Sequence, residues 1–225
     1  MTYKARALAL CEALPRIYPD AHCELDFSNP LELLIATILS AQCTDVQVNK
    51  VTPAVFKKYR TAQAYADADP LEFEQDLRAI GLYRNKAKNI RACARILVDE
   101  HGGKVPETMK ALVRLPGVGR KTANVVLGNA FGQNVGVVVD THVGRLSARL
   151  GLTKEADPKK IEIKLMKLVP QNHWTLFSHW LIFHGRRRCK AQNPDCPNCE
   201  LKDLCPSYPK LIKSKDKSRK NTLSS

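Results

Sequence analysis

Apolar residues recur at helical spacing along most of this chain, and cap or turn residues separate the periodic segments. Ser28, Asn29 and Pro30 form a helix-start signal, and the run of Leu, Ile and Ala that follows predicts a helix to about Ala41. Because this run is apolar on nearly every side, the helix is expected to be the buried centre of the fold. The chain is therefore predicted to be all-α. Further helices are predicted within residues 1–20 and at 44–59, 61–68, 69–81, 85–100, 106–115, 121–131 and 140–150, then from 158 onward and at 172–185.

Two segments allow a second interpretation. The β-branched residues at 135 and 137–139 are compatible with a strand, but no other run offers a partner, so a buried extended linker is predicted. An aromatic stripe at helical spacing is more often core than a platform for stacking bases, because RNA-stacking modules use sheet faces. The members of that stripe are Trp174, Phe177, Trp180 and Phe183.

Composition points to a globular protein with a polyanionic partner. The chain has 225 residues, of which 44% are hydrophobic, enough for one large or two small domains. Its formal net charge of +14 favours a polyanion, since each phosphate neutralised by Lys or Arg releases a counterion. No stretch is apolar enough to span a membrane, so nucleic acid is favoured over a membrane surface. The N-terminus lacks secretory features, which favours a cytoplasmic protein, and residues 209–225 are expected to be a disordered basic tail.

The eight cysteines fall into two sets. Those at 11, 23, 43 and 93 are scattered and are expected to be buried or partly buried free thiols. The other four have the spacing C-x6-C-x2-C-x5-C, in which only the central pair is as tight as a typical zinc arm. An iron-sulfur cluster is favoured over zinc on this spacing, and zinc stays open. The clustered set is Cys189, Cys196, Cys199 and Cys205.

The segment 111–142 concentrates the candidate chemistry. Gly117 and Gly119 predict a turn with positive φ between two helices. The unpartnered N–H groups that start the second helix, with Arg120 and Lys121 beside them, form a candidate phosphate cradle. An ordinary helix C-cap and turn is the alternative for the glycines, as phosphate binding is for Lys121 and helix capping for Asp140.

The motifs LPGVGRKTA and VDTH, together with the four-cysteine tail, resemble those of the endonuclease III family of helix-hairpin-helix, iron-sulfur DNA glycosylases. The resemblance extends from about residue 33 to Cys205. It implies that Lys121 is the nucleophile and Asp140 its carboxylate partner, and that the four clustered cysteines hold a 4Fe-4S cluster. It also implies two all-α domains with the active site in a cleft between them. They are a helical barrel at 23–132 and a cluster domain made of 1–22 and 133–208, with 209–225 as tail.

The same resemblance implies a reaction on damaged double-stranded DNA. The enzyme would be a monomer of bacterial or archaeal type, in the nucleoid-associated cytoplasm, that removes oxidised pyrimidines and cleaves abasic strands by β-elimination. The extruded base leaves a gap, and the resemblance assigns its filling to Gln42 and Leu82. From the residues alone, Gln42 reads as a surface amide and Leu82 as a core contact at a helix end. The residues assigned to DNA binding are Gln42, Leu82, Gly117, Val118, Gly119, Arg120, His142 and Arg186.

Some features depart from the pattern or admit other functions. The loop between the first two cluster cysteines is typically basic in the family, but here it contains Asp195, so Arg186, Arg187 and Arg188 are expected to take over part of its phosphate binding. His142 is compatible with an ordinary interface histidine. The alternatives are an adenine or other monofunctional glycosylase, which the presence of Lys121 disfavours, and a non-catalytic DNA-binding module, which the presence of Asp140 disfavours.

Overall fold

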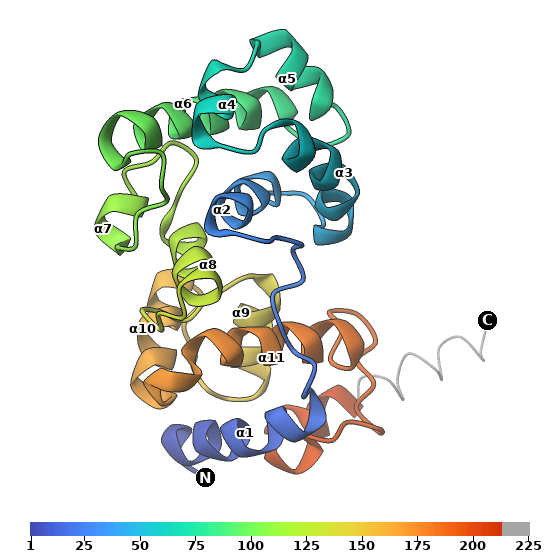
Figure 1. The fold of residues 1–225 in the computed structure, drawn as a ribbon. Helices are drawn as coiled ribbons and strands as arrows, with labels where there is room; N and C mark the ends of the chain where they lie inside the picture. Colours follow the sequence, from blue (N-terminus) through green and yellow to red (C-terminus); the bar gives the residue numbers. More distant parts are fainter. Residues whose placement is uncertain (213–225) are drawn as a thin grey trace, which may run out of the picture. The chain divides into compact units, whose positions relative to one another are not determined.

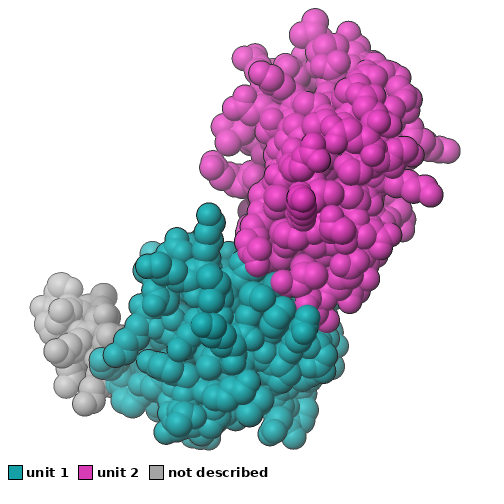
Figure 2. Space-filling model, turned by 90° about the vertical axis from the view of Figure 1, so that its left-hand side faces the viewer, with its two compact units in different colours: residues 1–22, 136–225 teal, residues 23–135 magenta. Residues whose placement is uncertain are grey.

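The computed structural model describes residues 1–212, and within that range every regular element is a helix (Figure 1). The all-α prediction is therefore confirmed. The chain divides into two compact units, one formed by residues 23–135 and the other by residues 1–22 together with the chain from 136 onward (Figure 2). Each unit has its own apolar core. No helix among residues 1–212 has the length and apolar character needed to cross a membrane.

The unit of residues 23–135 is built around α2 (Pro30–Leu39), which packs against α3, α6 and α8. Asn29 caps this helix by accepting a hydrogen bond from the Glu32 N–H, and the Glu32 carboxylate accepts one from the Ser28 N–H. Every residue from 33 to 39 is buried, so the predicted central helix is confirmed, although it ends two residues early. The other helices are α3 (Asp45–Lys58), α4 (Ala62–Asp67), α5 (Pro70–Asp76), α6 (Tyr83–His101), α7 (Met109–Leu112) and α8 (Arg120–Ala130).

The other unit is built around α11 (Trp174–Arg187), which packs against α1 and α9. Phe177, Trp180 and Phe183 are at most 5% exposed, and Trp174 is half-buried and packs against the same core, so the core interpretation of the aromatic stripe is confirmed. Residues 132–140 contain no strand, and Val137 and Val138 are buried, as the linker interpretation predicts. The remaining elements are α1 (Tyr3–Ile17), α9 (Thr141–Arg149), α10 (Pro158–Leu168), η1 (Gln171–His173) and η2 (Lys202–Leu204).

Three predicted boundaries are wrong for local reasons. Helix α7 begins at Met109 and not near residue 106, because the Thr108 side chain caps it by accepting a hydrogen bond from the Ala111 N–H. Helix α5 ends at Asp76 and not near 81, since the following residues form tight turns such as the 2.8 Å bond from the Ile80 N–H to the Leu77 carbonyl. In the predicted tail, residues 209–212 continue a helical turn, and 213–225 lie outside the described residues.

Candidate active site and cysteine pocket

The hairpin between α7 and α8 needs glycine at one of its two glycine positions. Gly117 has a φ of +79°, and a β-carbon there would lie 3.2 Å from Cβ of Asn89 and 3.4 Å from Cγ2 of Ile38. The hairpin therefore rests closely on α2 and α6, which a larger residue would prevent. Gly119 differs from the prediction, because its φ of −90° is extended backbone open to any residue.

Gly119 instead serves as the N-cap of α8, without a side-chain hydrogen bond to the first turn. The first backbone N–H groups of the helix thus face no capping side chain, and the helix dipole adds partial positive charge there. Arg120 and Lys121 are both exposed in this first turn, while Val118 is buried and anchors the hairpin. Helix N-termini of this kind suit anionic ligands, and the phosphate cradle predicted here stays a prediction.

Asp140 is the N-cap of α9. Its Oδ1 accepts a hydrogen bond from the Val143 N–H at 2.8 Å, and the side chain is partly buried. A carboxylate is favoured at this position because it lies at the positive end of the helix dipole. The helix-capping role is therefore observed directly, and a catalytic role has to be additional to it.

His142 belongs to a network that sequence reasoning missed. Nη2 of Arg145 donates to Nδ1 of His142 at 3.2 Å, to the Gly185 carbonyl at 3.1 Å and to the Cys189 carbonyl at 3.0 Å. A β-carbon on Gly185 would lie 2.8 Å from Nδ1 of His142, so the absent side chain makes room for the ring. Arg145 thus joins the start of α9, where Asp140 and His142 lie, to the first clustered cysteine. The only sequence signal was two arginines one turn apart, Arg145 and Arg149.

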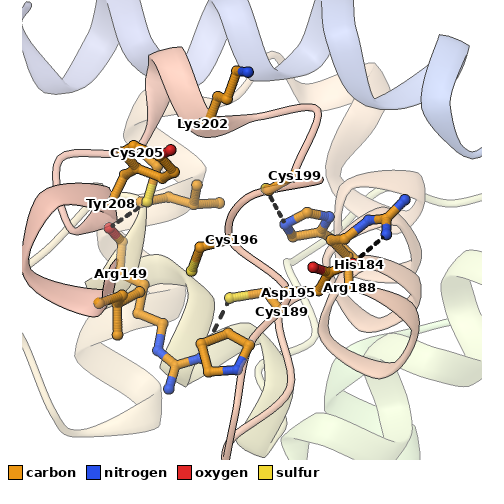
Figure 3. A pocket seen from close by; sticks show the side chains of 13 residues that line it. Arg149, His184, Arg188, Cys189, Asp195, Cys196, Cys199, Lys202, Cys205 and Tyr208 are labelled. Atoms are coloured by element: carbon orange, nitrogen blue, oxygen red, sulfur yellow. Dashed lines mark hydrogen bonds and ion pairs between the residues drawn. The ribbon is translucent and has the colours of Figure 1, made fainter. Parts of the chain in front are cut away.

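The four clustered cysteines line one pocket, with Cys189 just after α11 and the others on the following loop (Figure 3). The pocket holds about 350 Å³ of empty space, counting the open solvent at its mouth. A four-thiolate zinc site would place each sulfur about 2.3 Å from one ion. Among residues 1–212 no group of three or more His, Cys, Asp or Glu side chains converges in that way. The four cysteines therefore share one cavity.

Two side chains approach the sulfurs as hydrogen-bond partners (Figure 3). Nη1 of Arg149 donates to Sγ of Cys189 at 3.3 Å and to the Lys190 carbonyl at 2.7 Å. Nε2 of His184 lies 3.7 Å from Sγ of Cys199, and Nδ1 of the same ring lies 2.8 Å from the Tyr18 hydroxyl. When that hydroxyl donates to Nδ1, the ring proton stands on Nε2 and points toward the sulfur.

The arginines before Cys189 are largely engaged within the protein. Arg187 donates to the Asp20 carboxylate at 2.7 Å. Arg188 donates to Asp195 and to Glu200, each at 2.7 Å. Arg188 is thus paired with two carboxylates, one of them the Asp195 that departs from the family pattern, and the transfer of phosphate binding to these arginines stays a prediction. Arg186 is exposed.

The two residues assigned to gap filling share an uncommon backbone conformation. Gln42 has a φ of 54° and Leu82 a φ of 58°, and among residues 1–212 Asn193 is the one other non-glycine residue with positive φ. Leu82 is 57% exposed, so the core contact expected from its sequence context is wrong. Gln42 is exposed, as expected for a surface amide. A large apolar side chain held out in solvent by a strained backbone is typical of a functional site.

The scattered cysteines are free thiols, as predicted. Cys11 and Cys93 are buried, and Cys23 and Cys43 are partly buried. Burial raises the pKa of Cys23 to about 11 and that of Cys93 to about 12, so both stay protonated and unreactive near neutral pH.

Comparisons with known proteins identify the family. Residues 35–171 match the family described as HhH-GPD superfamily base excision DNA repair protein. Endonuclease III of Synechocystis sp. is 55% identical over 204 residues, covering 91% of this chain and 93% of the relative. A structure of a non-covalent endonuclease III–DNA complex superimposes with a TM-score of 0.88 at 48% identity, covering 95% of this chain and 99% of the other. A trapped endonuclease III–DNA covalent intermediate gives the same TM-score at 49% identity, covering 94% and 99%. The chain belongs to the HhH-GPD superfamily of base excision DNA repair proteins and, within it, to the endonuclease III family.

Proposed function

We propose that this chain is a bifunctional DNA glycosylase and AP lyase, which removes oxidised pyrimidines of the thymine glycol type from duplex DNA and cleaves the strand at the abasic site. The observation that carries the proposal is the exposed amine of Lys121 in the first turn of α8, directly after the hairpin. The proposal is supported by the 49% identity between this chain and an endonuclease III that has been trapped covalently on DNA.

DNA binding is proposed to begin with phosphates. The N-terminal N–H groups of α8 and the exposed Arg120 suit a phosphate oxygen, and a net charge of +14 favours association through counterion release. A base inside the duplex shields its sugar from attack, so the damaged nucleotide has to be extruded. Gln42 and Leu82 are proposed to enter the space that it leaves. His142 and Arg186 are proposed to contact the DNA as well.

The chemistry is proposed to start with the Lys121 amine. A neutral amine attacks C1′ of the sugar, the C–N bond to the base breaks, and the base leaves with the bonding electrons and takes up a proton. Asp140 stabilises the positive charge that develops on the sugar and accepts the amine proton. The C1′–O4′ bond of the sugar ring then breaks, O4′ takes up a proton, and Nζ and C1′ form a Schiff base. The Schiff base makes the C2′ proton acidic, and loss of that proton expels the 3′ phosphate by β-elimination.

We propose that Cys189, Cys196, Cys199 and Cys205 hold a 4Fe-4S cluster. The residues present fit such a group, because the four cysteines line one common cavity. Arg149 and His184 supply donors toward two of the sulfurs, as outer partners of such clusters do. When bound, the cluster would crosslink the loop from residue 189 to 205. Through the Arg145 bond to the Cys189 carbonyl, that loop supports the start of α9.

The wider expectations also remain proposals. The two compact units are proposed to act as the barrel domain, near 23–132, and the cluster domain, made of 1–22 and 133–208. The chain is proposed to work as a monomer in the bacterial cytoplasm, where its DNA substrate lies.

Borohydride trapping on a duplex with a single thymine glycol tests the proposal. Wild type should form a covalent adduct and Lys121→Gln none, because borohydride reduces the Schiff base that only the amine can form. Lys110→Gln is the matched control, since Lys110 is exposed on the neighbouring α7 and its loss removes the same charge. Binding without an adduct in wild type would indicate a monofunctional glycosylase or a DNA-binding module instead.

A further inference from the structure

Lys86 is a lysine whose charged end is buried. It lies in the first turns of α6 and is 5% exposed. Its Nζ donates to the Leu39 carbonyl oxygen at 2.8 Å, and no carboxylate pairs with it among residues 1–212. Burial accordingly lowers the pKa of Lys86. An ammonium removed from water without a counterion is unfavourable for stability, so its presence calls for another explanation.

The side chain of Lys86 contacts the C-terminus of α2. The last carbonyls of a helix have no partner within it, and Lys86 satisfies the one at Leu39. A positive charge is favoured there by the helix dipole. The chain then turns through Ser40 and Ala41, and Gln42 follows three residues after the carbonyl that Lys86 holds.

The backbone of Lys86 lies at the start of α6. The backbone N–H of Lys86 donates to the Leu82 carbonyl at 3.2 Å, so the same residue that holds the end of α2 also closes the first turn after Leu82. Two further contacts join these loops. A β-carbon on Gly81 would lie 3.7 Å from the Gln42 carbonyl oxygen, and Nε2 of Gln47 donates to the Ala79 carbonyl at 3.1 Å.

Both loops carry strain that something has to maintain. A non-glycine residue at positive φ costs roughly 1 to 3 kcal/mol and persists only where its surroundings fix it. Gln42 and Leu82 are such residues, and neither is buried. Their own side chains therefore do little to hold their backbone. The side chain of Lys86 bonds the end of α2, and its backbone lies in the first turn of α6 directly after Leu82, so this residue links the two segments.

We propose that Lys86 is a positioning residue for base extrusion, which holds the loop of Gln42 and the start of α6 at Leu82 in one fixed register. Fixed in this way, the two side chains enter the gap in the duplex together. This inference rests on the proposed function, because it needs Gln42 and Leu82 to act on the base stack. It accounts for a buried ammonium where an apolar side chain of the same length would fill the space without the desolvation cost.

The experiment compares one abasic site in two settings, a duplex and the same strand alone. Filling a gap matters only in the duplex, since a single strand has no stack to open. In Lys86→Met, single-turnover cleavage of the duplex should fall on the order of 10- to 100-fold, while cleavage of the single strand stays close to wild type. Leu82→Ala should show the same selective loss. Lys88→Met, at an exposed lysine of the same helix, should lose little on either substrate beyond the effect of one charge.

The ratio of the two rates separates positioning from simple destabilisation. A fall of equal size on both substrates, or no fall on the duplex while Leu82→Ala shows one, would overturn the inference. Thermal melting by circular dichroism first establishes that the variant is folded. If Lys86→Met does not fold, Lys86→Gln, which keeps a polar terminus, is judged by the same ratio. A wild type that cleaves neither substrate would overturn the proposed function, and the inference with it.

Discussion

The Asp140 carboxylate accepts a hydrogen bond from the Val143 N–H at 2.8 Å, so a residue assigned to catalysis also caps α9. Substitutions at Asp140 can distinguish its capping role from its proposed catalytic role. Asparagine caps a helix about as well as aspartate. The free energy of unfolding of Asp140→Asn should therefore lie within about 0.5 kcal/mol of the wild-type value, while turnover falls on the order of 100-fold. Asp140→Ala should lose the same activity and in addition about 1 kcal/mol of stability. Urea unfolding and single-turnover kinetics measure the two effects. Unchanged turnover in Asp140→Asn would leave Asp140 with the capping role alone.

Leu82 should show a conflict between stability and activity. Its φ of 58° is readily adopted by glycine but strained for leucine, and its side chain is 57% exposed, so little packing is lost on truncation. Leu82→Gly should therefore raise the free energy of unfolding by about 1 kcal/mol, while duplex cleavage falls. Leu82→Ala keeps the β-carbon and should lose the activity without the gain in stability. Equal melting temperatures for the two variants would contradict the strain argument.

Gly185 should tolerate alanine poorly, in contrast to a second glycine of the same unit. A β-carbon on Gly185 would meet His142 Nδ1 at 2.8 Å and Arg145 Nη2 at 3.0 Å, so the ring or the guanidinium has to move. We expect Gly185→Ala to cost about 1 to 3 kcal/mol and to weaken DNA binding. At Gly144 the nearest atom would be Ile161 Cδ1 at 3.8 Å, and Gly144→Ala should stabilise the helix by about 1 kcal/mol. Melting and fluorescence anisotropy with DNA compare the pair, and matching losses would contradict the packing argument.

The parts of the fold that were predictable from sequence are those set by local signals. The centre of α2 follows from its cap at Asn29 and Pro30 and from an apolar run that can only be buried. The start of α7 was missed because a proline and a threonine two residues apart both signal a helix start, and only Thr108 forms the capping bond. Leu82 was misjudged because leucine rarely adopts positive φ, so nothing local predicts its conformation.

The candidate site divides in the same way. The cysteines, Lys121 and Asp140 stand in motifs that can be read along the chain. Arg145 and Lys86 do not, since each acts on a carbonyl far away in sequence. Arg145 reaches one 44 residues on, and Lys86 one 47 residues before it. A backbone carbonyl has no residue identity, so no sequence pattern reveals such a contact.

Arg149 is expected to slow the loss of iron from the proposed 4Fe-4S cluster. It donates to Sγ of Cys189, and its two Nη atoms donate to the carbonyls of Lys190 and Ala191 at 2.7 and 2.8 Å, which holds the start of the cysteine loop closed. In Arg149→Met we expect iron to be lost to a chelator on the order of tenfold faster, because outer partners of metal ligands typically have effects of that size. The visible absorbance of the purified protein follows the loss. Arg16→Met, at an exposed arginine of the same unit, is the control, and equal rates in the two variants would contradict the prediction.

His179 should make the protein less stable in mild acid. Burial lowers the pKa of His179 from 6.5 to about 4, so between these values the unfolded chain binds a proton that the folded chain does not. The free energy of unfolding should therefore fall as the pH drops from 6.5 to 4, with a contribution from this residue of up to about 3 kcal/mol. Above pH 6.5 the ring is neutral in both states and contributes no slope. In His179→Gln the free energy of unfolding should fall by up to about 3 kcal/mol less over this pH window, whatever the variant's stability at neutral pH. Urea unfolding at several pH values measures both slopes, and parallel curves would show that His179 titrates as an exposed histidine does.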